Sequence, residues 1–178
     1  MGGRPWDVET HCPSHDSTYG RFGSPNSGTG ASQSFTFKYS SVNGFTYRST
    51  VYALINGSLS GSGGCYPYYV AASNALYMYN DAGTDMVGPL TPGSGGRLEN
   101  SQCTINGART SVTGTGSTLS VKLAVSFSPS FAGAQTLFGY AADSGNLNSG
   151  WQTLGTWTVP AGSFSELWDN APDYGNKW

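Results

Sequence analysis

Residues 7–16 hold the densest group of side chains that could do chemistry. They include both histidines of the chain, His11 and His15, together with Cys12 and Asp16. On a helix, two histidines four residues apart lie on one face, an arrangement that is common in metal sites. With Cys12 or Asp16 as a third ligand, this segment could hold zinc or copper.

The same residues allow nucleophilic catalysis, because a neighbouring imidazolium lowers the pKa of a thiol. Pro13 interrupts the spacing, however, and the segment has no helix or strand pattern. In a strand, the adjacent His11 and Cys12 would face opposite ways. The simpler interpretation is an exposed polar arm, with Cys12 in a disulfide between chains. A small hydrolase or metalloprotein with its site at His11, Cys12, His15 and Asp16 is therefore the alternative function, and we expect a protein that is not an enzyme.

Two oxygen-rich stretches, residues 80–85 and 143–148, have side chains that suit calcium. Calcium takes six to eight oxygen ligands, but neither stretch has the glutamate that closes an EF-hand loop. Asn and Asp before glycine normally form turns. We therefore expect turns here and no cofactor, with zinc in the arm or calcium in these loops as alternatives.

Aromatic residues alternate with other types along several strand-like stretches, so some of them must face outward. The candidates for ligand binding are Tyr68, Tyr77, Tyr79, Trp151 and Trp157. A flat ring on a sheet can stack on the C–H face of a sugar, and low charge suits a neutral polymer. The alternative is that half of these rings fill the core and the others pair across strands.

The composition favours strands and excludes several classes of protein. Glycine supplies 26 of 178 residues, 26/178 ≈ 15%, and charged residues only 10%. So much glycine disfavours a helical bundle. The chain has 8 basic and 10 acidic residues, so it lacks the excess of positive charge that a nucleic-acid-binding protein carries. The 13% of aromatic residues argues against long disorder, and no apolar stretch is long enough to span a membrane. An all-β protein remains.

The elements that must position these side chains follow from hydrophobic alternation and turn signals. Strands are expected at 34–39, 45–55, 66–70, 75–79, 118–127, 136–142 and 151–159, with short strands between them. In 118–127 the apolar residues all lie on one face. About eight short strands with frequent turns are typical of a β-sandwich. We expect an irregular N-terminal arm over 1–33, a sandwich domain over 34–160 and a C-terminal tail over 161–178.

Cys65 and Cys103 have no CxxC partner, so a metal knuckle is not expected. A disulfide between them would close a loop of about 38 residues and contribute about 3–4 kcal/mol in the loop-entropy description. The alternative is two buried thiols that pack as small hydrophobic groups. Residues 1–5 are not followed by the apolar stretch that a signal peptide contains. We therefore expect that the chain is either cytosolic or given without its signal peptide.

Several stretches taken in order resemble a bacterial extracellular immunoglobulin-like module of uncertain function, found in large secreted proteins. They are 35–37, 51–56, 65–66, 74–83, 98–103, 131–133, 148–151 and 155–159. The resemblance covers about residues 34–159. It implies an immunoglobulin-like antiparallel sandwich, a Cys65–Cys103 disulfide, and a secreted or cell-surface location for a chain that lacks its signal peptide. It implies no catalytic residues.

Together these observations predict a non-catalytic extracellular module for adhesion, spacing or carbohydrate binding. Its partner would be a polysaccharide or another surface polymer, with no nucleic acid and no membrane insertion. A second alternative is a self-assembling surface or filament subunit, in which the arm adds a strand to a neighbour's sheet edge.

Overall fold

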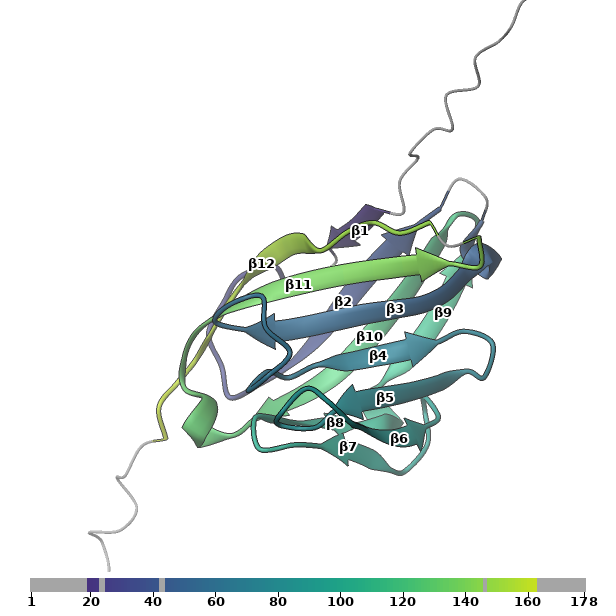
Figure 1. Ribbon diagram of the computed structural model, residues 1–178. Coiled ribbons are helices and arrows are strands. Elements are labelled where there is room, and N and C mark those ends of the chain that lie inside the picture. Colours follow the sequence, from purple (N-terminus) through teal and green to yellow (C-terminus); the bar gives the residue numbers. More distant parts are fainter. Residues whose placement is uncertain (1–18, 23–24, 42–43, 146, 163–178) are drawn as a thin grey trace, which may run out of the picture.

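In the computed structural model the chain forms two antiparallel β-sheets that pack face to face (Figure 1). The structure describes residues 19–22, 25–41, 44–145 and 147–162. Within these ranges the helical segments are three 3-10 turns: η1 (Phe45–Tyr47), η2 (Gly107–Arg109) and η3 (Pro129–Phe131). The predicted all-β sandwich is confirmed. None of the described helical segments has the length and apolar composition needed to cross a bilayer.

The first sheet, sheet A, has the order β1-β2-β10-β8-β7, and β9 also pairs with β10. Its strands are β1 (Tyr19–Phe22), β2 (Ser32–Ser40), β7 (Arg97–Glu99), β8 (Cys103–Asn106), β9 (Ser111–Thr115) and β10 (Thr118–Phe127). The bounds of β10 are those that its alternating sequence predicts. Its apolar face, Leu119, Val121, Leu123, Val125 and Phe127, is buried.

The second sheet, sheet B, has the order β12-β11-β3-β4-β5-β6. Its strands are β3 (Arg48–Asn56), β4 (Pro67–Val70), β5 (Ala75–Tyr79), β6 (Met86–Leu90), β11 (Gly133–Asp143) and β12 (Gln152–Val159). The predicted hairpin is the β4–β5 pair, whose turn places Asn74 at a φ of 47°. The segment 136–142 is predicted to be a strand because it is short and flanked by glycine, and it lies inside β11.

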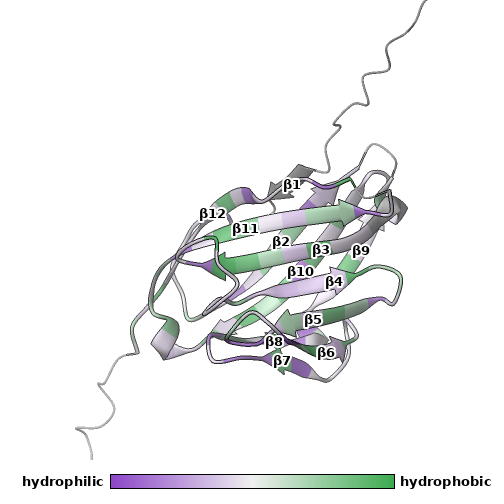
Figure 2. Ribbon diagram, viewed as in Figure 1, coloured by the Kyte–Doolittle hydropathy of each residue, from purple (hydrophilic) through white to green (hydrophobic). Residues whose placement is uncertain are grey.

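The core lies between the sheets because each strand turns alternate residues inward. Figure 2 shows the result as green and purple bands that succeed one another along the strands. Phe35 sits in the middle of this core, with its ring centroid 6.1 Å from that of Phe127 and 5.2 Å from that of Trp157. The two sheets are also joined covalently, because Cys65 and Cys103 form a disulfide. The disulfide expected from the resemblance is therefore present.

The segment expected to be an irregular arm contributes to both sheets. β1 pairs with β2 along its whole length, with Tyr19 opposite Ser40. Residues 26–30 run beside β12 and share three backbone hydrogen bonds with it, such as Gly30 N to Thr158 O at 3.0 Å. Residues 19–22 and 26–30 therefore pair with strands of the sandwich, although they lie before the domain boundary expected at residue 34. Hydrogen bonds of this kind are made by the backbone, so the Gly-, Ser- and Asn-rich composition of 26–30 gave no sign of them.

Candidate functional site

Seven aromatic side chains gather on the outer face of sheet B, the face turned away from the core. They are Tyr52, Tyr66, Tyr68, Tyr77, Tyr79, Tyr140 and Trp151, and we call them the aromatic patch. In β3, Val51 and Ala53 are buried in the core. Because strand residues alternate between faces, Tyr52 between them must point outward.

Strand register aligns four of these tyrosines in one row across the sheet. Tyr140 of β11 lies opposite Tyr52 of β3, Tyr52 lies opposite Tyr68 of β4, and Tyr68 lies opposite Tyr77 of β5. Ring centroids in this row are 5.6, 5.2 and 5.3 Å apart in that order. Neighbouring strands are separated by about 4.8 Å, so the rings of aromatic residues at facing positions contact each other without a change in the backbone.

The other three rings complete the patch beside this row. Tyr66 and Tyr79 stack with centroids 4.4 Å apart and an interplanar angle of 23°. Trp151, which immediately precedes β12, contacts Tyr140 at 5.4 Å and Tyr66 at 5.8 Å. It also reaches Tyr52 at 6.3 Å, so Trp151 links the row of four to the stacked pair.

The stacking decides what the patch presents to solvent. Tyr68 lies between Tyr52 and Tyr77 with interplanar angles of 27° and 15°, and it is only 8% exposed. Its hydroxyl donates to Met86 Sδ on the edge strand β6. The other six rings are half-buried. Stacked rings cover each other's faces, so the middle of the patch offers ring edges and hydroxyls. Open ring faces can occur where a stack ends, or on a ring such as Trp151 whose contacts are tilted or edge-on.

Three phenols of the patch, those of Tyr52, Tyr66 and Tyr68, stay neutral to a higher pH than an exposed tyrosine does. Burial raises the pKa of Tyr52, Tyr66 and Tyr68, and the nearby phenolate charge of Tyr79 raises it further in each case. At neutral pH these hydroxyls are therefore hydrogen-bond donors as well as acceptors.

Two connected turns fix one border of the patch. Asn100 Nδ2 donates to the carbonyl oxygens of Gly64 (2.9 Å) and Tyr79 (3.2 Å). Asp81 accepts from Ser101 Oγ at 2.6 Å and from Ser101 N at 2.8 Å. These two hydrogen bonds, the side-chain one foremost, lower the pKa of the Asp81 carboxyl. The β5–β6 turn is thus held against the β7–β8 turn.

The two oxygen-rich stretches use their side chains to form turns. Asn80 Oδ1 accepts from Thr84 N at 3.0 Å, and Asp143 Oδ1 accepts from Gly145 N at 2.8 Å and Leu147 N at 2.9 Å. Among the described residues, no group of three or more His, Cys, Asp and Glu side chains is placed to hold a metal. His11, Cys12, His15 and Asp16 lie outside the described residues.

The structure brings together four of the five aromatic candidates. Tyr68, Tyr77, Tyr79 and Trp151 all belong to the patch. Trp157 does not, and the prediction that it faces a ligand is wrong: it is 5% exposed, and its indole N–H donates to Gly30 O at 2.9 Å inside the sandwich. Tyr52, Tyr66 and Tyr140 were not among the candidates, although their outward positions in strands were a usable signal.

No family model matches the chain, and no curated protein is significantly similar to it. The role of the aromatic patch therefore has to be inferred from its geometry and chemistry.

Proposed function

We propose that the protein is a non-catalytic module that binds a neutral polysaccharide on the aromatic patch. The observation that carries this proposal is the collection of seven aromatic rings on an open sheet face, where an ordinary sandwich surface would carry polar side chains. Half-buried aromatic groups with polar tips are typical of binding surfaces, because they combine apolar area with hydrogen-bonding capacity.

The surroundings favour an uncharged ligand. The described outward side chains of β3, β4, β5 and β11 include no Lys, Arg, Asp or Glu; beside the tyrosines they are residues such as Thr50, Leu54 and Thr136. A charged polymer would lose hydration at this face without gaining an ionic partner. A neutral sugar offers C–H groups to the rings and hydroxyls to the phenols, and so suits both features.

The stacking geometry assigns different roles to different rings. Sugar stacking requires an open ring face, which points to Tyr77 at one end of the Tyr52–Tyr68–Tyr77 stack and to Trp151, whose ring contacts are tilted or edge-on. The hydroxyls of the inner tyrosines would hydrogen-bond to the sugar hydroxyls. Because the rings stand on paired strands, the patch needs little rearrangement on binding, which lowers its entropic cost.

A secreted or cell-surface location also belongs to this proposal. The Cys65–Cys103 disulfide persists best in an oxidising compartment. That is the compartment in which a module of this kind would meet polysaccharides.

Isothermal titration calorimetry against neutral glucans, xylans, mannans and galactans tests the proposal. We expect Trp151→Ala and Tyr77→Ala to weaken binding about tenfold each, since loss of one aromatic contact of about 1–1.5 kcal/mol has this effect. Thr113→Ala, at an exposed position on sheet A, is the control and should bind normally. The proposal fails if no neutral polysaccharide binds, or if both aromatic variants bind as well as the wild type.

A further inference from the structure

The outer face of sheet A differs completely from that of sheet B. Its outward side chains on β2 and β10 are small hydroxyl residues and lysines, such as Ser34, Thr36, Lys38, Ser120 and Lys122. Their neighbours on these strands, Phe35, Phe37, Val121 and Leu123, point into the core. The described outward positions of β2, β8, β9 and β10 carry no aromatic residue, and Ala124 is the apolar exception.

Among the side chains that the structure describes, the cations belong to this sheet or to the turn that follows β8. The Lys and Arg side chains described by the structure are Lys38 in β2, Lys122 in β10, Arg97 in β7 and Arg109 in η2, which follows β8. Arg97 forms an ion pair with Glu99, with 2.9 Å between Nε and Oε2. Among the described residues this is the one ion pair. Lys38, Lys122 and Arg109 are exposed and have no such partner there.

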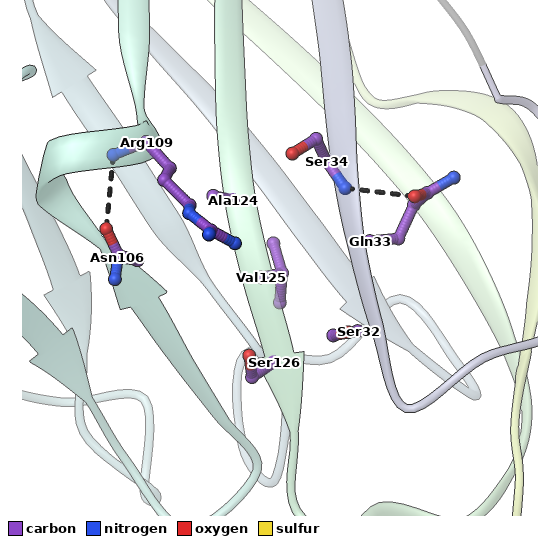
Figure 3. Close-up of a pocket in the computed structure, with 8 residues that line it drawn as sticks. All are labelled: Ser32, Gln33, Ser34, Asn106, Arg109, Ala124, Val125 and Ser126. Atoms are coloured by element: carbon purple, nitrogen blue, oxygen red, sulfur yellow. Dashed lines mark hydrogen bonds between the residues drawn. The ribbon is translucent and has the colours of Figure 1, made fainter.

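The three unpaired cations occupy three successive rows of the sheet. Lys38 stands in the row of Ser120, and Lys122 stands in the row of Thr36. The next row pairs Ser34 with Ala124, and the Arg109 side chain extends from η2 toward Ala124, as Figure 3 shows. Outward rows are two residues apart along a strand, or about 7 Å. The face therefore carries three positive charges, one in or beside each of three successive rows, with hydroxyl groups between them.

The Arg109 end of this line is hollowed into a shallow groove. Its volume is about 290 Å³, and Ser34, Asn106, Arg109 and Ser126 are among the residues that line it (Figure 3). The backbone N–H of Arg109 is held by Asn106 Oδ1 at 3.1 Å, which fixes the turn from which the guanidinium extends. A guanidinium binds a carboxylate through two parallel hydrogen bonds, and the hydroxyls beside it suit the hydroxyls of a sugar.

We propose that the outer face of sheet A binds a linear polysaccharide that carries carboxylate groups, a polyuronate. Arg109 in the groove would pair with one carboxylate, and Lys122 and Lys38 would pair with later ones along the chain. A single-stranded nucleic acid is disfavoured, because its binding relies on aromatic rings that stack on bases. This site is separate from the aromatic patch and does not depend on it.

Affinity measurements with polygalacturonate test this inference, and its methyl-esterified form is the matched neutral ligand. We expect the acid form to bind at least about tenfold more tightly than the ester, and added salt to weaken its binding. Replacing Lys38, Lys122 or Arg109 singly by Gln should weaken binding by up to about fivefold, and the triple variant by about tenfold or more. Gln retains most of each aliphatic stem, so the fold should persist.

Two control variants show whether binding depends on these three cations in particular. Arg97→Gln removes a cation of the same sheet that is already paired, and it should leave the affinity for polygalacturonate unchanged. Trp151→Ala should also leave it unchanged, so failure here and failure of the aromatic patch give different results. The inference is overturned if the acid and the ester bind equally, if the triple variant binds normally, or if an oligonucleotide of equal charge binds more tightly than the uronate.

Discussion

At the scale of single residues, the patch shows how a tyrosine can serve structure and binding together. Tyr68 covers both of its ring faces with Tyr52 and Tyr77, which removes apolar area from water without a hydrophobic layer above the sheet. The cost is that the phenols stand in surroundings poor in water. This cost should appear as altered ionisation.

We therefore expect Tyr52, Tyr66 and Tyr68 to ionise at a higher pH than exposed tyrosines. The pKa values of Tyr52, Tyr66 and Tyr68 are raised, first by burial and then by neighbouring phenolates. The folded state thus favours the neutral phenol, so the stability from these groups is complete below the ordinary pKa of about 10 and is lost as the pH rises beyond it.

Phenolate absorbance across an alkaline titration measures this shift. Folded protein should show a group of tyrosines that ionises late, and unfolding in denaturant should abolish the delay. Trp151→Ala uncovers the patch and should move these pKa values down toward the ordinary one. A titration of the folded protein in which all tyrosines ionise together near their ordinary pKa would contradict the packing described.

Gly28 is a second residue with a measurable role. A Cβ at this position would lie 2.4 Å from Cζ3 of Trp157, closer than atoms can approach. We expect Gly28→Ala to destabilise the protein by about 1–3 kcal/mol, because residues 26–30 must shift away from β12. Gly95→Ala is the control, since a Cβ there meets nothing within 4 Å. Equal denaturant midpoints for the two variants would show that the 26–30 segment does not need this close contact.

At the scale of elements, the disulfide joins the two layers. Cys103 belongs to β8 of sheet A, and Cys65 precedes β4 of sheet B. The loop between them spans 38 residues in sequence. The double variant Cys65→Ala with Cys103→Ala should lose about 3–4 kcal/mol of unfolding free energy, since its unfolded chain is no longer restricted.

Denaturant unfolding of the double variant, compared with wild type with and without a reductant, checks this value. Reduced wild type and the double variant should unfold at similar denaturant concentrations. If the variant is as stable as the oxidised wild type, the disulfide contributes nothing and the core alone holds the sheets together.

The same scale shows what the sequence could predict. Strand β10 was predictable to the residue, because its apolar and polar residues alternate with the single exception of Ala124. Trp151 and Trp157 are both odd-numbered, and simple alternation places them on one face. The register between β11 and β12 shifts, however: Thr153 lies opposite Phe138, and Gly155 lies opposite Leu137. This extra residue in β12 reverses the alternation, so Trp151 faces outward and Trp157 inward.

A bulge of this kind depends on the partner strand, so the sequence of β12 alone does not reveal it. The row Tyr140–Tyr52–Tyr68–Tyr77 was hidden for a similar reason. Each tyrosine could be placed on a strand, but that they face one another depends on register, which long-range pairing decides.

At the scale of the whole molecule, the two proposed sites lie on opposite outer faces of one sandwich. The described carboxylates other than Glu99, which is paired with Arg97, are those of Asp81, Asp85 and Asp143, and they lie in or beside sheet B. Lys38 and Lys122 belong to sheet A, and Arg109 belongs to the η2 turn that follows β8. Two layers of strands packed through a shared core are about 10 Å apart. Ligands on the two faces would therefore be separated by the full thickness of the protein and would not compete.

The two proposals together predict that one molecule holds a neutral and an acidic polysaccharide at once. Saturation with the neutral polymer should leave the affinity for polygalacturonate within about twofold of its free value, because the sites share no residue and the charges are screened over about 10 Å at moderate salt. A mixture of both polymers with the protein should form a network, seen as a rise in light scattering that either polymer alone does not give. Trp151→Ala and the triple Gln variant should each reduce this rise, because each weakens binding at a different end of the bridge. Competition between the two polymers would instead place both ligands on one face, and would assign the cations of sheet A to a different role.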